Sequence, residues 1–324
     1  MRALLTTLSV ALLVLACGAA PEETPPSAAE STSVQEEAVA VSNMLGGCIL
    51  TTPIGEVPDD LYLVTDVAAT NEVPPFTKKL VVFGLTLAAG DDASDDFMRL
   101  VAQAITEIFP QDEGLDLAKQ EEILRNQYLY KALIPVPVGE DFSFFEDNEE
   151  VFEQTASQNT ICDIIMQDVP GQVMEVVEHI LHYVSDVGLH YTFPAEWGIS
   201  KDSELAAAMD ESIEKGYYVV EQYGEILEES ENGGGEEEYF RVLMQEFAYW
   251  VISTAWNLQE AYGPVGEAEW NILNAADLEE KMPALYDMYE RTVATVMVAP
   301  SLETLQKIGP TRAEERAADD DAGE

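Results

Sequence analysis

Residues 173–187, VMEVVEHILHYVSDV, are the stretch that decides the fold prediction for this chain. Apolar side chains recur there every three or four residues, which is the spacing of one face of an α-helix. Val173, Val177 and Ile180 fall on that apolar face. The opposite face gathers the polar residues Glu175, Glu178, His179, His182, Ser185 and Asp186. The segment therefore predicts an amphipathic helix in the middle of the chain.

All three histidines of the 324-residue chain lie in or just after this segment, at His179, His182 and His190. Glu178 and His182 are four residues apart, so both project from one face of the helix, one turn apart. Two side chains at that spacing hold one ion in the H-E-x-x-H motif, and zinc accepts carboxylate oxygen as well as imidazole nitrogen. The pattern predicts a metal site. The alternative interpretation is the ordinary polar face of a helix in a glutamate-rich protein.

Strand-like patterns precede this helix, and helical patterns dominate after it. Before it we expect strands over 61–65 and 79–87, helices over 94–108 and 117–130, and an extended segment over 132–138. After it we expect helices over 203–229, 237–262, 267–274 and 277–291. This order predicts an α+β fold that is mainly helical. A small strand and helix subdomain over 43–145 would precede a helical subdomain over 146–310.

The N-terminus is typical of an exported lipoprotein. A positive start and a short apolar run over 3–15 indicate a secretory signal peptide. The run ends in VLAC at 14–17, which resembles a lipobox. The resemblance implies a signal peptide over 1–16 and acylation of Cys17, which would hold the protein at a membrane. Gly18 after the cysteine implies the outer membrane, in a cell that has one; a plain signal peptide with a chance cysteine is the alternative.

Two segments have the composition of disordered chain. The segment over 17–42 is rich in Ala, Pro, Glu, Ser and Thr and has no aromatic residue, so we expect a flexible acidic tether there. The acidic tail over 311–324 is expected to be disordered as well.

The charge of the chain limits its partners. It has 15 Lys and Arg residues against 62 Asp and Glu residues, a net charge of -47. Nucleic-acid binding needs a basic surface, so no nucleic-acid partner is expected. Electrostatic docking on anionic lipid is not expected either, and the lipid on Cys17 is the predicted membrane contact.

Cys48 and Cys162 remain once Cys17 is assigned to the lipid anchor. An exported protein meets an oxidising compartment, where an even pair of cysteines is often joined. Spacing alone does not place the two side chains side by side, so a disulfide and two free thiols both remain open.

Three stretches, taken in order, resemble an uncharacterised family of secreted, metallopeptidase-like proteins with an E-E-x-x-H helix. The first, VVFGLTLAAGDDASDDFMRLVAQAI at 81–105, resembles the family's strand and a helix opened by small polar residues. The second, VVEHILHYVSDVGLHYTFP at 176–194, resembles its L-E-E-x-x-H-x-x-T-x-x-G-Y segment. The third, QEFAYWVIS at 245–253 followed by EAEWNIL at 267–273, resembles its T-E-Y-F-Y-W-A-L and E-W-x-L motifs.

The resemblance implies a zincin-like helical part and assigns roles to single residues. Glu178 and His182 match the family's glutamate and histidine. Glu246 matches the glutamate before the aromatic pair, which implies a third zinc ligand of the gluzincin type. His179 stands where the family has the glutamate expected to act as general base, so it is either the base, a ligand or the mark of a lost base. His190 is an extra candidate ligand or a structural residue.

These features together predict an exported, lipid-anchored, zincin-like metalloprotein, with zinc peptidase activity on peptides as the enzymatic hypothesis. The alternative is a non-catalytic envelope lipoprotein whose acidic helical domain binds a partner or divalent cations. His179 in the position of the family's base leaves the choice between the two open.

Overall fold

The computed structural model describes residues 48–140, 142–224, 226, 235–264, 269–314 and 317. The predicted signal peptide, Cys17 and the tether lie outside these residues, and most of the predicted acidic tail does too. Among the described residues, none of the helices combines the length and the apolar character needed to cross a membrane.

The protein has an α+β fold that is mainly helical, as the sequence predicts. Its described residues include a sheet with the strand order β1 (Ala68–Ala69), β2 (Lys78–Val82), β3 (Leu85–Ala89) and β4 (Leu133–Pro135). Strand β2 pairs antiparallel with both β1 and β3, whereas β4 pairs with β3 in parallel. The edge position of β4 suits its proline, which has no N–H to donate to a further strand.

A tight turn divides the predicted strand over 79–87 into two strands. Phe83 and Gly84 both have positive φ, at 52° and 90°, and join β2 to β3 as a hairpin. A Cβ atom on Gly84 would lie 2.8 Å from Cβ of Gln127, so the glycine is also needed for space. The predicted strand over 61–65 is reduced to one bridge, between Val64 and Val82.

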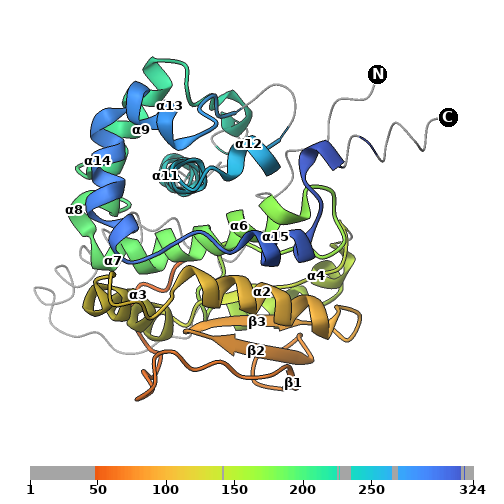
Figure 1. Cartoon of the computed structure of the whole chain (residues 1–324). Helices are drawn as coiled ribbons and strands as arrows, with labels where there is room; N and C mark the ends of the chain where they lie inside the picture. Colours follow the sequence, from red (N-terminus) through yellow and green to blue (C-terminus); the bar gives the residue numbers. More distant parts are fainter. Residues whose placement is uncertain are drawn as a thin grey trace, which may run out of the picture.

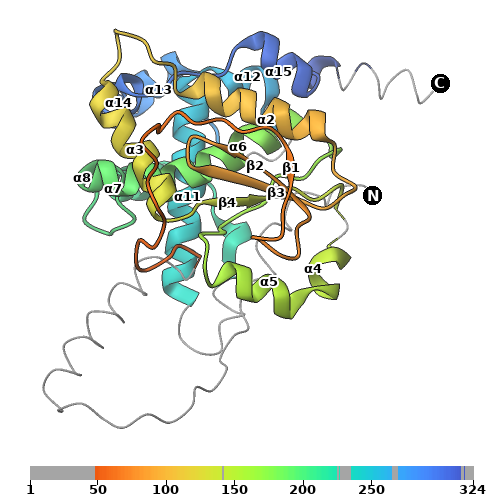
Figure 2. The same ribbon diagram turned by 90° about the horizontal axis from the view of Figure 1, so that it is seen from below.

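Helix α2 (Asp95–Ile108) covers one face of the sheet, as Figures 1 and 2 show. Ser94 caps this helix, because its hydroxyl accepts the Phe97 N–H at 3.3 Å. The buried face of α2 consists of Met98, Val101, Ala102, Ala104, Ile105 and Ile108. Both this helix and α3 (Leu117–Leu129) confirm the predictions for those segments.

Two helices that pack against each other carry the candidate site. Helix α6 (Gln172–Tyr183) continues into a π-helix (Val184–Leu189) and then into α7 (His190–Thr192). Helix α11 (Gly235–Ala255), seen nearly end-on in Figure 1, packs against α6. The predicted amphipathic helix is therefore present, and its last turns are π-helical.

Shorter helices surround this pair and the sheet. They are α4 (Ser143–Asp147), α5 (Glu149–Ala156), α8 (Pro194–Trp197), α9 (Glu204–Glu214), α12 (Leu258–Tyr262), α13 (Ala275–Lys281), α14 (Pro283–Arg291) and α15 (Leu302–Ile308). Single 3-10 turns occupy Glu221–Tyr223 and Val293–Thr295.

The predicted helix over 203–229 is confirmed only for its first part, and the predicted helix over 267–274 is wrong for its described residues. Helix α9 ends at Glu214, and Gly216 then takes a φ of 71°. Tyr218 continues in extended conformation and forms an antiparallel bridge with Trp270. The backbone over 269–271 is therefore paired with 217–219 and is not helical.

Two predicted long helices are each divided in two. The helix expected over 237–262 breaks at Asn257, which adopts a left-handed φ of 60° between α11 and α12. The helix expected over 277–291 breaks before Pro283, whose missing N–H suits the first position of a new helix.

One continuous set of buried apolar side chains extends from the sheet through α2 and α6 to α11. Leu87, Ile105, Ile180 and Phe247 are among its fully buried members. The core thus includes residues from both halves of the chain, and the boundary between 43–145 and 146–310 stays a prediction.

Candidate metal centre

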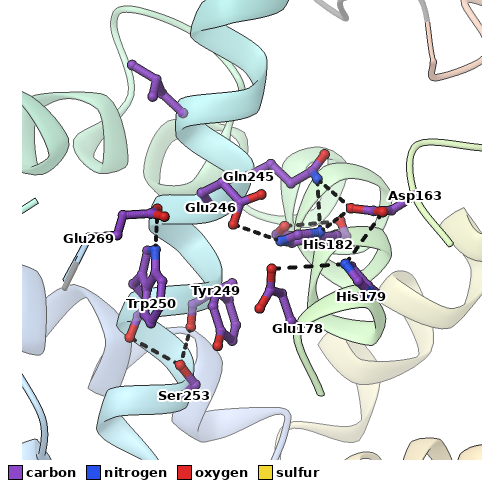
Figure 3. Close-up of polar contacts among 12 residues, drawn as sticks. Asp163, Glu178, His179, His182, Gln245, Glu246, Tyr249, Trp250, Ser253 and Glu269 are labelled. Atoms are coloured by element: carbon purple, nitrogen blue, oxygen red, sulfur yellow. Dashed lines mark hydrogen bonds and ion pairs between the residues drawn. The ribbon is translucent and has the colours of Figure 1, made fainter. Parts of the chain in front are cut away.

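The polar face of α6 is buried inside the protein. His182 is 0% exposed, His179 2% and Asp186 1%. Helix α11 and the segment around Asp163 lie over this face, as Figure 3 shows. An ordinary polar helix face would be in water, so the burial of these side chains favours a specific role over that interpretation.

The two ring nitrogens of His182 have different surroundings. Nδ1 lies 2.8 Å from Oδ2 of Asp163 and 2.9 Å from Nε2 of Gln245. Nε2 lies 3.5 Å from Oε2 of Glu246, is buried, and has no hydrogen-bond partner among the described residues. The ring therefore presents one satisfied nitrogen to the protein and one unsatisfied nitrogen toward the glutamate of α11 (Figure 3).

The structure brings the three predicted ligands together. Glu178 and His182 come from α6 and Glu246 from α11, and one ligand atom of each lies within 4.8 Å of the other two. Neighbouring ligand atoms of a tetrahedral zinc ion are about 3.3 Å apart, given bonds of about 2.0–2.1 Å. The 3.5 Å between Nε2 of His182 and Oε2 of Glu246 is close to that spacing.

A second group, Asp163 with His179 and His182, also has ligand atoms within 4.8 Å of one another. Its closest pair is Nδ1 of His182 and Oδ2 of Asp163, at 2.8 Å. That is a hydrogen-bond distance, shorter than the spacing of two ligands of one zinc ion. We therefore assign Nδ1 to hydrogen bonding and the unsatisfied Nε2 to the candidate metal position.

Burial and the carboxylates of the cluster favour the protonated forms of Glu178 and His182. Burial, with the nearby carboxylate of Glu246, raises the pKa of Glu178 to about 8. Burial alone would lower the pKa of His182, but the carboxylates of Glu246 and Asp163 raise it well above its ordinary value. The cluster thus has a deficit of positive charge, which protons or a divalent cation would supply.

His179, the residue in the family's general-base position, lies between carboxylates. Its Nδ1 is 3.1 Å from Oε1 of Glu175 without forming a well-aligned hydrogen bond, and its Nε2 is 3.5 Å from Oδ1 of Asp163. Burial would lower the pKa of His179, yet the carboxylates of Asp163 and Glu175 raise it to about 10. This arrangement suits an imidazolium, whose two N–H groups would both face carboxylates. A catalytic role for His179 stays a prediction.

The structure does not bring His190 to the cluster. Its Nδ1 accepts the backbone N–H of Ile199 at 2.9 Å, and its ring contacts Tyr191. The π-helix between His182 and His190 changes the number of residues per turn, so the spacing of an α-helix no longer relates the two side chains. The structural role that the sequence left open for His190 fits these contacts.

The burial of His190 predicts a loss of stability in acid. Burial lowers its pKa to about 4, whereas an unfolded histidine titrates near pH 6.5. Its contribution to folding is therefore complete above pH 6.5 and is lost as the pH falls toward 4. Between pH 7 and 4.5 the wild type should lose about 2–3 kcal/mol more unfolding free energy than His190→Gln. Urea unfolding measures this; equal losses in the two proteins would contradict it.

A buried network that the sequence analysis missed supports the cluster. Arg241 Nη1 lies 3.2 Å from Oδ2 of Asp186 and also donates to the side-chain oxygen of Gln245. This contact fixes the Gln245 amide, so that its Nε2 faces Asp163 at 3.2 Å. Asp163 and Arg241 have no periodic or motif signal in the sequence, and only the fold shows that both contact Gln245.

Glu269, from the segment after α12, contacts Trp250, which lies one turn along α11 from Glu246. Its Oε1 accepts hydrogen bonds from Nε1 of Trp250 and from the hydroxyl of Tyr223, both at 2.7 Å. Burial, with the charge of Glu246, raises the pKa of Glu269 to about 7. Of the EAEWNIL stretch, residues 269–273 lie in the described part, and Glu269 is the residue that extends the polar cluster.

The two remaining predicted site residues in the described part are joined. Cys48 and Cys162 form a disulfide across a sequence separation of 114. Cys17, the predicted lipidation site, lies outside the described residues.

No protein-family model, curated protein or solved structure matches this chain. The zincin-like resemblance therefore stays a hypothesis, and the geometry of the site carries the functional argument.

Proposed function

We propose that this chain is a metalloprotein in which Glu178, His182 and Glu246 bind one zinc ion. The observation that carries the proposal is the buried Nε2 of His182, which has no hydrogen-bond partner in the described part of the chain and faces a glutamate. Leaving a buried polar atom unsatisfied costs about 1–3 kcal/mol, so such an atom in a folded protein calls for a ligand. One nitrogen and two carboxylate oxygens are a donor set that zinc accepts.

The exposure of the ligands supports an open site. The side chain of Glu178 is 27% exposed, whereas those of Glu246 and His182 are 11% and 0% exposed. Three protein ligands with one free position are typical of catalytic zinc sites, whereas structural sites have four. A bound zinc ion there would supply Lewis acidity and an acidified water. We therefore propose hydrolysis of peptides as the activity.

A non-catalytic metal-binding protein is the second candidate, and His179 favours it. Both ring nitrogens of His179 face carboxylates, and an imidazolium in that position has no lone pair with which to accept a proton. Metal binding does not depend on His179, whereas a conventional peptidase mechanism needs a general base.

Zinc titration of the full chain in detergent solution tests the metal site. The protein is first freed of metal with a chelator and then titrated calorimetrically in excess Ca²⁺. Calcium occupies surface carboxylates but binds imidazole nitrogen poorly, so it suppresses the background expected from a net charge of -47. We expect one zinc ion per chain. Absence of a stoichiometric site would overturn the proposal.

Peptide cleavage separates the two candidate functions. The zinc-loaded protein is incubated with a mixture of fluorogenic peptides, with and without a chelator. Hydrolysis that the chelator abolishes and added zinc restores supports the peptidase. Stoichiometric zinc without such hydrolysis supports the non-catalytic candidate.

We propose further that the protein is exported and anchored by lipid on Cys17. The lipobox-like VLAC at 14–17 supports this, and the Cys48–Cys162 disulfide is consistent with an oxidising compartment. In a bacterial host that processes lipoproteins, wild-type protein should partition into the detergent phase of a phase-separating detergent. Cys17→Ser should move it to the aqueous phase. Equal partitioning of the two proteins would contradict the anchor.

A further inference from the structure

A carboxylate from outside α6 and α11 holds the far side of the His182 ring. Oδ2 of Asp163 lies 2.8 Å from Nδ1 of His182, and the same oxygen accepts Nε2 of Gln245 at 3.2 Å (Figure 3). Metal-binding histidines commonly donate their second ring N–H to a carboxylate, which fixes the tautomer and the ring orientation. The Gln245 amide nitrogen, 2.9 Å from Nδ1, then donates to Oδ2 of Asp163 and not to the ring. With the proton on Nδ1, the lone pair of Nε2 faces the candidate metal position.

The backbone around Asp163 is itself held by buried hydrogen bonds. The hydroxyl of Tyr183, a fully buried residue of α6, accepts the N–H groups of Cys162 and Asp163, both at 3.1 Å. Oδ1 of Asp163 accepts the Ile164 N–H at 2.8 Å. These contacts leave the carboxylate little freedom to turn away from His182.

The disulfide adds a covalent constraint next to Asp163. Cys162 precedes Asp163 directly and is joined to Cys48, whose carbonyl also accepts the Ile161 N–H at 3.3 Å. Ile49, next to Cys48, packs in a small apolar cluster that includes Val187 of the π-helix. The disulfide therefore connects the segment around Asp163, through Cys48 and Ile49, to the π-helix that continues the helix of His182.

We infer that Asp163 is a positioning residue of the metal site, and that the Cys48–Cys162 disulfide keeps it in place. The inference rests on the proposed zinc function. Asp163 acts through His182 and does not touch the metal. A dithiol would reduce the disulfide to two thiols while itself becoming a disulfide, and zinc binding would weaken because the Asp163 segment loses its covalent link.

Asp163→Asn is the direct test, with Asp168→Asn as its matched control. Asp168 is in the same segment but is exposed, and its side chain contacts Gln167 instead of His182. An Asn amide at position 163 can donate to Nδ1 of His182, which moves the imidazole proton onto Nε2. Zinc affinity, measured against a competing chelator dye, should fall by about 10–100-fold in Asp163→Asn and stay unchanged in Asp168→Asn.

Nitrogen-15 NMR of the wild type gives a readout that a purely structural role would not produce. The chain has only three histidines, so their ring signals are few. In the zinc-loaded protein His182 should show a slowly exchanging Nδ1–H and a metal-bound Nε2, and Asp163→Asn should lose the slow exchange. If the spectrum of the wild type shows metal bound to Nδ1 of His182 instead, the inference is wrong. This result needs the wild type alone, so it holds even if no variant folds.

The variant Cys48→Ala/Cys162→Ala tests the disulfide without a reductant that binds zinc. Circular dichroism first establishes that this variant is folded. Its zinc affinity should then lie between those of the wild type and Asp163→Asn. Wild-type affinity in this variant would overturn the role of the disulfide, and wild-type affinity in Asp163→Asn would overturn the role of Asp163. Absence of zinc binding in the wild type itself would instead remove the proposed function.

Discussion

Replacing His182 with alanine is expected to weaken zinc binding by more than about 100-fold, because loss of an outer hydrogen-bond partner alone costs about 10–100-fold. His182 supplies the only nitrogen of the proposed ligand set, and its Nε2 is buried without a hydrogen-bond partner among the described residues. Without it, two glutamate oxygens remain, a donor pair that calcium or magnesium would bind as readily as zinc. Competition with a chelator dye measures the change.

His190→Ala is the matched control for this prediction. It removes the same side chain from the same continuous helical stretch, but its ring nitrogen bonds the Ile199 N–H and lies outside the candidate ligand groups of the described residues. Its zinc affinity should equal that of the wild type. Loss of zinc from His190→Ala together with full retention by His182→Ala would reverse the ligand assignment.

Replacing Arg241 with methionine should lower the free energy of unfolding by about 3–5 kcal/mol, the range measured when one partner of a buried ion pair is removed. Arg241 is 5% exposed, and its partner Asp186 is 1% exposed. Burial already raises the pKa of Asp186 to about 6, although Arg241 lowers it. Methionine fills similar space but leaves the buried carboxylate without a counter-charge.

The sign of the pH dependence provides a check on this prediction. Without Arg241, the pKa of Asp186 in the folded state rises further above its unfolded value. The stability deficit of Arg241→Met should therefore be largest at neutral pH and shrink as the pH falls and Asp186 binds a proton. Urea unfolding at several pH values measures it. A deficit that grows in acid would contradict the assignment.

Two comparison variants separate the buried pair from a general effect of charge. Lys281 pairs with Asp277 at 3.2 Å, but both side chains are at least one-third exposed. Lys281→Met should change stability by at most about 1 kcal/mol. The double variant Asp186→Leu/Arg241→Met should recover much of the loss, since it leaves no buried charge unpaired.

Local patterns predicted the central helix and the ligand pair on it. The apolar spacing of 173–187 places α6, and the four-residue interval fixes Glu178 and His182 on one face. Glu246 was assigned by resemblance, and the structure places it beside His182 because α11 packs on α6. The starts of two predicted helices, at 94 and 203, are also correct, because Ser94 and Ser203 cap the N-termini of α2 and α9.

The parts that sequence could not provide depend on distant contacts or on subtle backbone geometry. Asp163 lies in a segment without periodicity, and only tertiary packing brings it to His182. The π-helix before His190 has no propensity signal, so the sequence left open whether that residue is a ligand or a structural residue. The helix predicted over 203–229 ends early, at Glu214, because pairing between Tyr218 and Trp270 overrides local helix propensity.

The unequal exposure of the three proposed ligands has a kinetic meaning. The side chain of His182 is 0% exposed and that of Glu246 11%, whereas that of Glu178 is the most exposed of the three, at 27%. An ion held there would enter and leave past the carboxylate of Glu178. Its residence time would therefore depend on how often that side chain moves away from the ion. Two chelators of equal strength but different size should then strip the metal at the same rate, since neither reaches it before that carboxylate moves.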